Sequence, residues 1–510
     1  MEQKELRKLV SAMSLEEKAL QLTQYPVYEL DESAEAVVTG LCDLGGIDRE
    51  ALWHTGTILN APNGETVQSI RKTRREKGIS DPFPFMLDVI HGYRTIYPVP
   101  LAMACTFNTA LIEDCAEFAA TEASCDGVDV TFSPMVDLGR DARWGRVMEG
   151  AGEDSYWIGE VGKAMIRGYH KGGIACCVKH FAGYGAAEAG REYNTTDISE
   201  RNLREYYLRA YRACLEERPE LFMSSFNLLN GKPILGHKEI MLDLLRKEWG
   251  FDGVVISDFG AVEELHEHGY CETGRDCARI AIESGLDIEM GSSVYASYLP
   301  ELVRTGAISE EKLDESVLRV LELKNKLGMY ENPERSTDLQ KRAEVTLSES
   351  GRALSRRAVE EGSVLLKNNG VLPLKENAKI ALVGPFASTR EIIGNWAGKG
   401  RIEECVTVKE GVEKLIKRAV PYANGCSWKL FDTDEGGFEE AERICAQADC
   451  IVACVGEHMM NSGEAHSRAD IRIPEIQRKL IAKLHKLKKP LVLVVFGGRP
   501  LVLSEIEEFA

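Results

Sequence analysis

The sequence has 510 residues, of which 44% are apolar and 28% are charged. A chain of this length is too long for a single hydrophobic core, so two or three domains are expected. The net charge of −19, without any basic run, argues against a nucleic-acid-binding protein.

The N-terminus is charged without an apolar signal core, and no apolar stretch reaches 18 residues. We therefore expect no membrane span and a cytoplasmic location. Fourteen cysteines without a secretion signal indicate reduced thiols. The pair Cys176-Cys177 and the pair Cys450 and Cys454 lie in apolar strand-like runs without His or Cys partners at zinc spacing, so no metal site is predicted.

The first fifty residues read as helices, and short apolar runs then alternate with helical segments such as Glu200–Glu217 and Lys238–Trp249. This alternation predicts a TIM-like (β/α)8 barrel over residues 1–332. Only seven strands are recognised, so the barrel is expected to be irregular. They are Thr55–Leu59, Pro84–Val89, Val128–Pro134, Ala175–Phe181, Phe222–Phe226, Gly253–Asp258 and Leu286–Met290.

A polar segment at 333–349, which begins at the Asn332-Pro333 step, reads as a linker. Residues 350–510 then predict a second α/β domain that begins with a helix at Ser350–Glu361. Its expected strands are Ser363–Lys367, Lys379–Val383, Cys450–Val455 and Leu491–Phe496. With so few strands, we expect an incomplete α/β sandwich with an open sheet edge and an exposed apolar face.

Asp258 ends the β-branched run from Gly253, which reads as a buried parallel strand. A β/α barrel places its chemistry at the carboxyl ends of such strands. Because burying a carboxylate is costly, its presence there needs a reason. The competing interpretation is that Asp258 caps the next helix.

Charged residues also follow the other predicted strands. They are Asp88, Arg140, Asp141, Arg143, Arg146, Lys179, His180 and Glu192. They could form structural ion pairs, but a ring of such groups also suits a polyhydroxylated ligand, whose hydroxyls both donate and accept hydrogen bonds. A central aspartate could attack an anomeric carbon if a second carboxyl group lay about 5–5.5 Å away.

Five strings, in order, resemble family 3 glycoside hydrolases of the bacterial β-glucosidase type. They are LDVIHGYRTIYPVPLA, FSPMVDLGRDARWGR, VKHFAGYGAAEAGREYNTTDIS, FNLLNGKP and VVISDFGA. The resemblance implies a barrel followed by an α/β sandwich, with Asp258 as the nucleophile. It also implies that Asp88, Arg143, Lys179, His180 and Glu192 bind the sugar. Met223 and Phe259 would line the same pocket.

The acid/base of this family comes from the second domain, and the candidate loop is 456–468. Ser462-Gly-Glu-Ala-x-Ser-Arg468 resembles the bacterial signature, which assigns the role to Glu464 and leaves Glu457 as the alternative. The motif of the N-acetylglucosaminidase subgroup is absent, so that activity is discounted.

The expected function is a retaining, exo-acting β-glucosidase that needs no cofactor or metal and acts on a β-glucoside or oligosaccharide. A β-xylosidase and a sugar-binding remnant without turnover remain alternatives. A barrel enzyme for phosphorylated metabolites is disfavoured because no Gly-rich phosphate loop occurs late in the barrel. Family members usually continue beyond the position of Ala510, so a completing C-terminal chain or a homo-oligomer is also considered as a partner.

Overall fold

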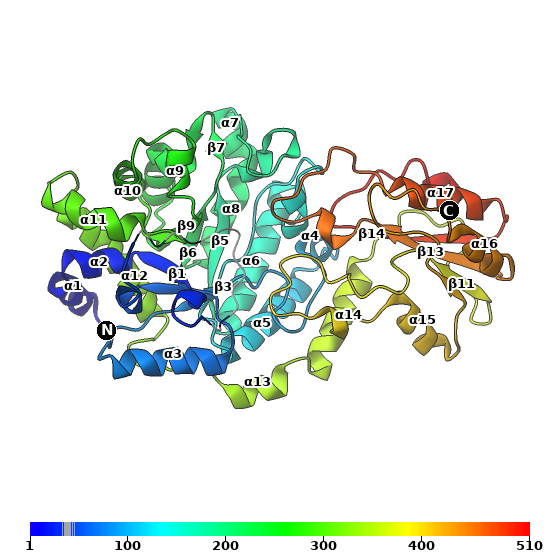
Figure 1. The fold of residues 1–510 in the computed structure, drawn as a ribbon, viewed down its shortest axis with the longest axis horizontal. Helices are drawn as coiled ribbons and strands as arrows, with labels where there is room; N and C mark the ends of the chain where they lie inside the picture. Colours follow the sequence, from blue (N-terminus) through cyan, green and yellow to red (C-terminus); the bar gives the residue numbers. More distant parts are fainter. Residues whose placement is uncertain (33, 35–41, 43, 45) are drawn as a thin grey trace.

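The computed structural model describes residues 1–510 except 33, 35–41, 43 and 45. It has two parts, a large barrel and a smaller sheet domain (Figure 1). The barrel is closed by eight parallel strands in the order β1-β10-β9-β6-β5-β4-β3-β2. These strands are β1 (Thr23–Pro26), β2 (Thr57–Leu59), β3 (Phe85–Leu87), β4 (Val130–Thr131), β5 (Ala175–Phe181), β6 (Leu221–Ser224), β9 (Val254–Phe259) and β10 (Ile288–Met290).

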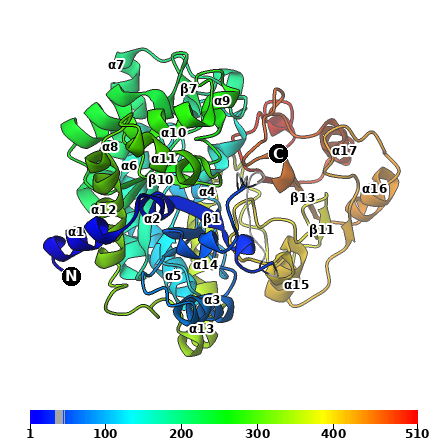
Figure 2. The same cartoon turned by 60° about the vertical axis from the view of Figure 1, so that its left-hand side comes forward.

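Helices surround the barrel (Figure 2). They are α1 (Gln3–Ala12), α2 (Leu15–Gln21), α3 (Gly64–Glu76), α4 (Pro100–Ala104), α5 (Thr109–Cys125), α6 (Ser155–Lys171), α7 (Glu200–Asn202), α8 (Arg209–Cys214), α9 (Glu264–Glu267), α10 (Gly274–Glu283), α11 (Val294–Arg304) and α12 (Glu310–Lys326). A short hairpin of β7 (Leu228–Leu229) and β8 (Lys232–Pro233) lies outside the barrel. No helix in the described ranges is long and apolar enough to cross a bilayer.

The eighth strand, β1, corrects the expectation that the first fifty residues are helical. Helices α1 and α2 confirm the expectation for residues 3–21, whereas most of 33–45 lies outside the described residues. Strand β1 is short, and it buries polar side chains instead of an apolar run. The Thr23 hydroxyl lies 3.2 Å from that of Thr55, and the Gln24 amide donates to the Thr57 hydroxyl at 3.1 Å. A hydrophobicity pattern therefore cannot detect this strand.

The second domain is built on a four-stranded parallel sheet in the order β12-β11-β13-β14. The strands are β11 (Ile380–Val383), β12 (Tyr422–Ala423), β13 (Cys450–Gly456) and β14 (Leu491–Phe496), and the helices are α15 (Val408–Ile416), α16 (Phe438–Ala446) and α17 (Glu475–His485). Alternate residues of β13 enter two apolar clusters: Ile451 and Ala453 pack with α16 and α17, whereas Val452 packs with α15. This period of two places helices on both faces of the sheet.

The expected linker at 333–349 contains a helix, α13 (Leu339–Val345), and leads into α14 (Glu349–Gly362). Arg342 of α13 pairs with Glu65 and with Asp126, whose Oδ1 lies 2.7 Å from Arg342 Nη1. The segment therefore packs against the barrel and is more than a flexible tether.

The prediction of a strand at Ser363–Lys367 is wrong, because this segment lies outside the four-stranded sheet. Its β-branched and leucine residues resemble a strand, but a strand needs a neighbour, and local sequence does not supply one. Leu365 and Leu366 are 65% and 73% exposed, and β14 forms one edge of the sheet. The described sheet thus has β14 at one edge, and the apolar residues Leu365 and Leu366 are exposed outside it; the expected exposed apolar face of the sheet stays a prediction.

We expect this exposed segment to promote self-association. In light scattering, the apparent mass of the wild type should rise with protein concentration. The double substitution Leu365→Ser and Leu366→Ser should reduce this rise. Leu415→Ser is the matched control, because Leu415 is 81% exposed but belongs to α15. Equal effects of the two variants would contradict a specific role for the segment.

Candidate active site

Asp258 lies at the carboxyl end of β9, and its two carboxylate oxygens have different surroundings. Oδ1 accepts a hydrogen bond from the Phe259 backbone N–H at 2.8 Å. Oδ2 is buried and receives no hydrogen bond from the described part of the chain. Burial, assisted by the charge of Glu464, raises the pKa of Asp258 well above its usual range. One oxygen is therefore held in place while the other has free lone pairs facing the pocket.

His180 explains why Asp258 Oδ2 stays free. Its Nε2 lies 3.6 Å from that oxygen and 3.2 Å from Arg146 Nη2. An arginine can only donate, so Nε2 is the acceptor and the ring proton is on Nδ1, which donates to Asp137 Oδ2 at 2.8 Å. Burial and the nearby cations lower the pKa of His180 well below its usual value, so the ring is neutral. A neutral Nε2 without a proton cannot donate a hydrogen bond to the Asp258 carboxylate.

The buried arginine of this site is Arg146, whereas the sequence resemblance implied Arg143. The Arg146 side chain is 2% exposed and binds both Glu149 oxygens at 2.9 Å. Arg143 is 43% exposed, forms a paired contact with Asp141, and does not line the pocket. The two arginines are three residues apart, Arg143 in a turn and Arg146 in the short 3-10 helix Gly145–Glu149. Local sequence does not determine which of them turns inward.

A second charged pair lies at the end of β3. Lys179 Nζ is 2.5 Å from Asp88 Oδ1, and this lysine is 3% exposed. The ammonium group also lies 5.6 Å from the centre of the Trp396 ring, which belongs to a loop of the second domain. Asp88 therefore balances the charge of Lys179, and the Trp396 ring faces the ammonium group.

Glu464 enters the site from the loop that follows β13. Its Oε1 lies 3.2 Å from Arg146 Nη1 and accepts a hydrogen bond from the Tyr193 hydroxyl at 2.9 Å. The side chain is 8% exposed. Burial raises the pKa of Glu464, although Arg146 opposes this shift. The second domain therefore contributes a carboxyl group that tends to keep its proton.

The alternative acid, Glu457, has a different environment. Arg499 Nε lies 3.0 Å from both of its oxygens, and Arg468 Nη1 donates to Oε1 at 2.9 Å. The Glu457 side chain is fully buried, and it does not line the pocket. It is thus an acceptor within a structural ion-pair cluster, which favours Glu464 as the acid.

Most of the predicted site residues meet in one pocket. Those that line it are Asp88, Lys179, His180, Met223, Asp258, Phe259 and Glu464. The pocket is narrow, at about 30 Å³, and shares Asp88, Trp396 and Glu464 with a neighbouring cavity of about 350 Å³. The arrangement is a small charged chamber that opens into a larger space between the two domains.

Glu192 supports this pocket but does not line it. Its Oε1 accepts a hydrogen bond from the Tyr184 hydroxyl at 2.5 Å, and Oε2 accepts one from the Trp144 indole. Burial raises the pKa of Glu192 to about 7. Its Oε1 lies 4.0 Å from Arg146 Nη1, so Glu192 contributes a negative charge near the buried arginine from outside the pocket.

The family can now be assigned from comparisons with known proteins. Residues 14–323 match the glycosyl hydrolase family 3 N terminal domain, and residues 363–510 match the C-terminal domain of the same family. The chain belongs to glycoside hydrolase family 3. The resemblance inferred from the sequence motifs is confirmed, as is the expected barrel followed by an α/β sandwich.

Relatives of this family 3 chain include the periplasmic beta-glucosidase of Salmonella typhimurium, which is 36% identical over 486 residues and 88% of this chain. The match covers 63% of that relative, so the chain spans less than two thirds of its length. A beta-xylosidase of Formosa agariphila is 31% identical, with 82% of this chain and 61% of the relative covered. A beta-glucosidase from Listeria innocua, solved with isofagomine, superposes with a TM-score of 0.95 and 39% identity, covering 100% of this chain and 71% of that one.

Several residues of the site were not singled out from the sequence. Trp396 carries no local signal, because it lies in a loop of the second domain far along the chain. Tyr193 and Asp137 act through hydrogen bonds that only the folded chain creates. Arg146 was noticed only as a member of an ion-pair cluster. Its contact with Glu464 joins the barrel to the second domain, which local sequence does not show.

Proposed function

We propose that this family 3 chain is a retaining, exo-acting β-glucosidase that hydrolyses terminal non-reducing β-D-glucosyl residues. The observation that carries the proposal is the unpartnered Oδ2 of Asp258 in a pocket that also holds Glu464. A free carboxylate oxygen can attack C1, and a carboxyl group with a raised pKa can donate a proton to the leaving oxygen.

In the first step, Asp258 Oδ2 forms a bond to C1 while the glycosidic C–O bond breaks. The leaving oxygen takes the proton of Glu464, which is then the carboxylate. In the second step, Glu464 removes a proton from water, the water oxygen bonds to C1, and the bond to Asp258 breaks. Each carboxyl group returns to its starting form, and the product keeps the β configuration.

The charges of the pocket favour a state in which Asp258 and Glu464 share one proton. The raised pKa of both Asp258 and Glu464 means that the two groups do not readily lose both protons together. Arg146 and Lys179 lower the pKa of each, so they stabilise a single negative charge. A positive charge developing on the sugar ring would draw that negative charge to Asp258, next to C1.

The paired Asp88 and Lys179 supply acceptors and donors for sugar hydroxyls, and Trp396 supplies an apolar face. The inner pocket and the neighbouring cavity share Asp88, Trp396 and Glu464, so in the proposal the sugar ring is bound where the two meet, with C1 at Asp258. The neighbouring cavity then holds the leaving group.

The names of the relatives support glucose as the sugar. Both the Salmonella relative and the Listeria structure are called beta-glucosidases, and the Listeria protein has also been solved with glucose at 38% identity. The Formosa relative is called a beta-xylosidase, which keeps a pentose substrate as the second candidate.

The test is hydrolysis of matched aryl β-glucoside and aryl β-xyloside by residues 1–510. We expect a higher kcat/KM for the glucoside, and NMR should show the β anomer as the first product. A higher kcat/KM for the xyloside would mean that the substrate is a β-xyloside and not a β-glucoside. An α anomer as the first product would contradict the retaining mechanism.

Arg146 gives a prediction on pH dependence. Since its charge lowers the pKa of both Asp258 and Glu464, Arg146→Met should raise both values. The acid limb of kcat/KM, where Asp258 must be ionised, and the alkaline limb, where Glu464 must be protonated, should both move to higher pH. Because Glu149 loses its partner, stability should fall by about 3–5 kcal/mol.

The control for this prediction is Arg143→Met, which removes the same charge from the exposed pair with Asp141. Its pH profile should match that of the wild type. An equal displacement of the limbs in both variants would mean that Arg146 has no special role at the carboxyl groups.

A further inference from the structure

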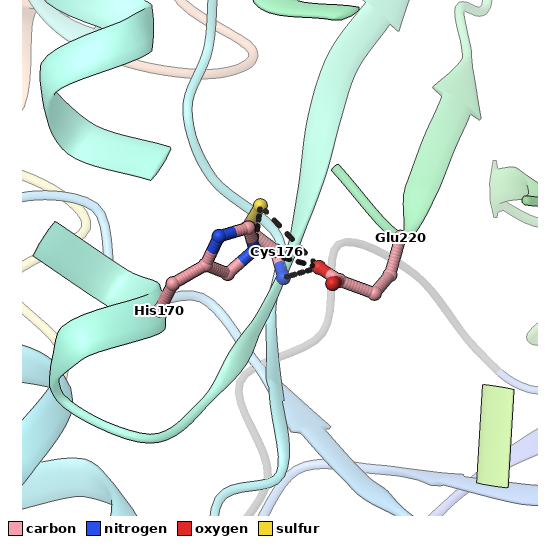
Figure 3. Close-up of side chains that lie close together, drawn as sticks. All are labelled: His170, Cys176 and Glu220. Atoms are coloured by element: carbon pink, nitrogen blue, oxygen red, sulfur yellow. Dashed lines mark hydrogen bonds and ion pairs between the residues drawn. The ribbon is translucent and has the colours of Figure 1, made fainter. Parts of the chain in front are cut away.

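Three side chains with metal-binding atoms converge at the end of the barrel opposite the pocket (Figure 3). His170 is in the last turn of α6, Cys176 is near the start of β5, and Glu220 directly precedes β6. His180, on the same strand as Cys176, reaches the pocket at the other end of β5. Four residues of strand separate the two by about 13 Å.

The separations of the three ligand atoms are short and of similar size. Cys176 Sγ lies 3.8 Å from His170 Nε2 and 3.7 Å from Glu220 Oε2, and these nitrogen and oxygen atoms are 3.0 Å apart. Figure 3 shows all three atoms pointing toward one another from three different elements. A histidine–glutamate hydrogen bond accounts for the last contact, and the Cys176 backbone N–H also donates to Glu220 Oε2 at 3.1 Å. The Cys176 thiol is in addition within reach of both partners, so all three ligand atoms lie around one point.

These separations fit one tetrahedral zinc ion. Bonds of about 2.3 Å to sulfur and about 2.0 Å to nitrogen and oxygen place sulfur about 3.5 Å from the other two ligands. The same geometry places nitrogen about 3.3 Å from oxygen. Each observed separation is within about 0.3 Å of this triangle. One thiolate, one imidazole and one carboxylate is also a ligand set that suits Zn²⁺.

We propose that His170, Cys176 and Glu220 form a binding site for Zn²⁺ or a similar divalent transition-metal ion, with water as the fourth ligand. Binding breaks the Sγ–H bond of Cys176, releases that proton to solvent and forms the Sγ–metal bond, without electron transfer. The thiolate and the Glu220 carboxylate then balance the two positive charges, so the buried site is neutral.

The surroundings allow an ion to enter. His170 is 34% exposed, whereas Cys176 and Glu220 are buried, so the site has one open side. Lys326 Nζ lies 2.7 Å from Glu220 Oε1, the oxygen that does not face His170 and Cys176, and its charge there opposes metal binding. Its side chain is 57% exposed and can turn into solvent. The metal would tie α6, β5 and β6 together at the end of the barrel remote from the reaction.

This site was not predicted from the sequence, which indicated that Cys176 is a core residue without a metal partner. His170 and Cys176 are six residues apart, but Glu220 lies forty-four residues beyond Cys176. Sequence spacing alone does not show that two adjacent parallel strands bring the third ligand into place. Within the described ranges, this is the one group of three such side chains whose ligand atoms converge.

The test uses Co²⁺ as a spectroscopic probe on chelator-treated protein of residues 1–510. We expect one equivalent of Co²⁺ to bind, with the near-ultraviolet absorption of a thiolate–cobalt bond, and Zn²⁺ to displace it. Cys176→Ser should abolish this absorption. Cys177→Ser is the matched control, because it makes the same change at the next residue of β5, and it should retain the band.

Two further variants should move the affinity in opposite directions. His170→Gln, at a partly exposed position, removes the imidazole ligand and should weaken Co²⁺ binding by at least about 10-fold. Lys326→Met should strengthen it, because the opposing ammonium charge is removed. If the wild type lacked the thiolate–cobalt band, or if the band persisted in Cys176→Ser, the proposal would be wrong.

The outcome is separable from that of the proposed hydrolase activity. Chelation should lower the thermal midpoint and metal should restore it, because an ion that binds only the folded chain stabilises it. Hydrolysis of an aryl β-glucoside at moderate temperature should be unchanged by chelation. A protein that binds no metal could therefore still be a glycosidase. A protein without glycosidase activity could still bind the metal.

Discussion

Asp258→Asn is expected to lower kcat/KM for an aryl β-glucoside by on the order of 10⁴-fold or more. The amide keeps the shape of the side chain, and its carbonyl can still accept from the Phe259 N–H, as Oδ1 does at 2.8 Å. It has no carboxylate oxygen to form the bond to C1. Steady-state kinetics with the wild type and the variant, prepared in parallel, measure the difference.

The same substitution should not weaken the fold. Burial raises the pKa of Asp258 in the folded chain above that of the unfolded chain. Such a group contributes stability below its unfolded pKa and loses it as pH rises through the folded pKa. Asp258→Asn should therefore have a higher thermal midpoint than the wild type at neutral and alkaline pH. This difference should disappear in acid below the ordinary aspartate pKa.

Asp141→Asn is the matched control, since it makes the same chemical change in the partly exposed pair with Arg143. Its kcat/KM should equal that of the wild type. If Asp258→Asn retained wild-type turnover, with mass spectrometry excluding deamidation back to aspartate, the nucleophile would have to be another residue.

The barrel was largely predictable because its strands are local features. Ala175–Phe181 was predicted with the bounds that the structure has, since a run of seven buried residues between turn signals leaves little freedom. Strand β1 was missed because Thr23 and Gln24 are buried by pairing with other polar side chains. Such pairing depends on the neighbouring strand, which local periodicity does not include.

The site was predictable only where a strand end determines its position. Asp258 and His180 follow from this rule, because the carboxyl ends of parallel strands meet at one rim. The choice between Arg143 and Arg146 does not, since both follow β4 within three residues of each other and only the folded chain buries one of them. Trp396 reaches the pocket through the docking of the second domain, and no local pattern encodes that contact.

Glu464→Gln should produce a defect that depends on the leaving group. For an alkyl or weakly acidic aryl β-glucoside, the leaving oxygen needs a proton, so the first step should slow by about 10²–10⁴-fold. For a dinitrophenyl β-glucoside, the oxygen leaves as a stable anion and the first step should stay close to the wild-type rate. Pre-steady-state kinetics with the two substrates separate this step from the second, in which Glu464 activates water.

Glu457→Gln provides the contrast, because Glu457 is the acceptor for Arg468 and Arg499. Removing its charge leaves two arginines, 10% and 0% exposed, without their carboxylate partner. A loss of about 3–5 kcal/mol in the free energy of unfolding is expected for breaking such a buried pair. The thermal midpoint should therefore fall, and any activity of the remaining folded protein should change equally for both substrates.

The ratio of the two substrates assigns the acid independently of stability. An unstable variant has fewer active molecules, which lowers both rates by one factor, whereas a missing proton donor lowers only the rate that needs the proton. Arg146 Nη1 lies 3.2 Å from Glu464, and burial still keeps the pKa of this carboxyl group raised. If Glu457→Gln showed the leaving-group dependence and Glu464→Gln did not, the acid would be Glu457. The loop that carries Glu464 would then have to move before the reaction, so that Glu457 could reach the pocket.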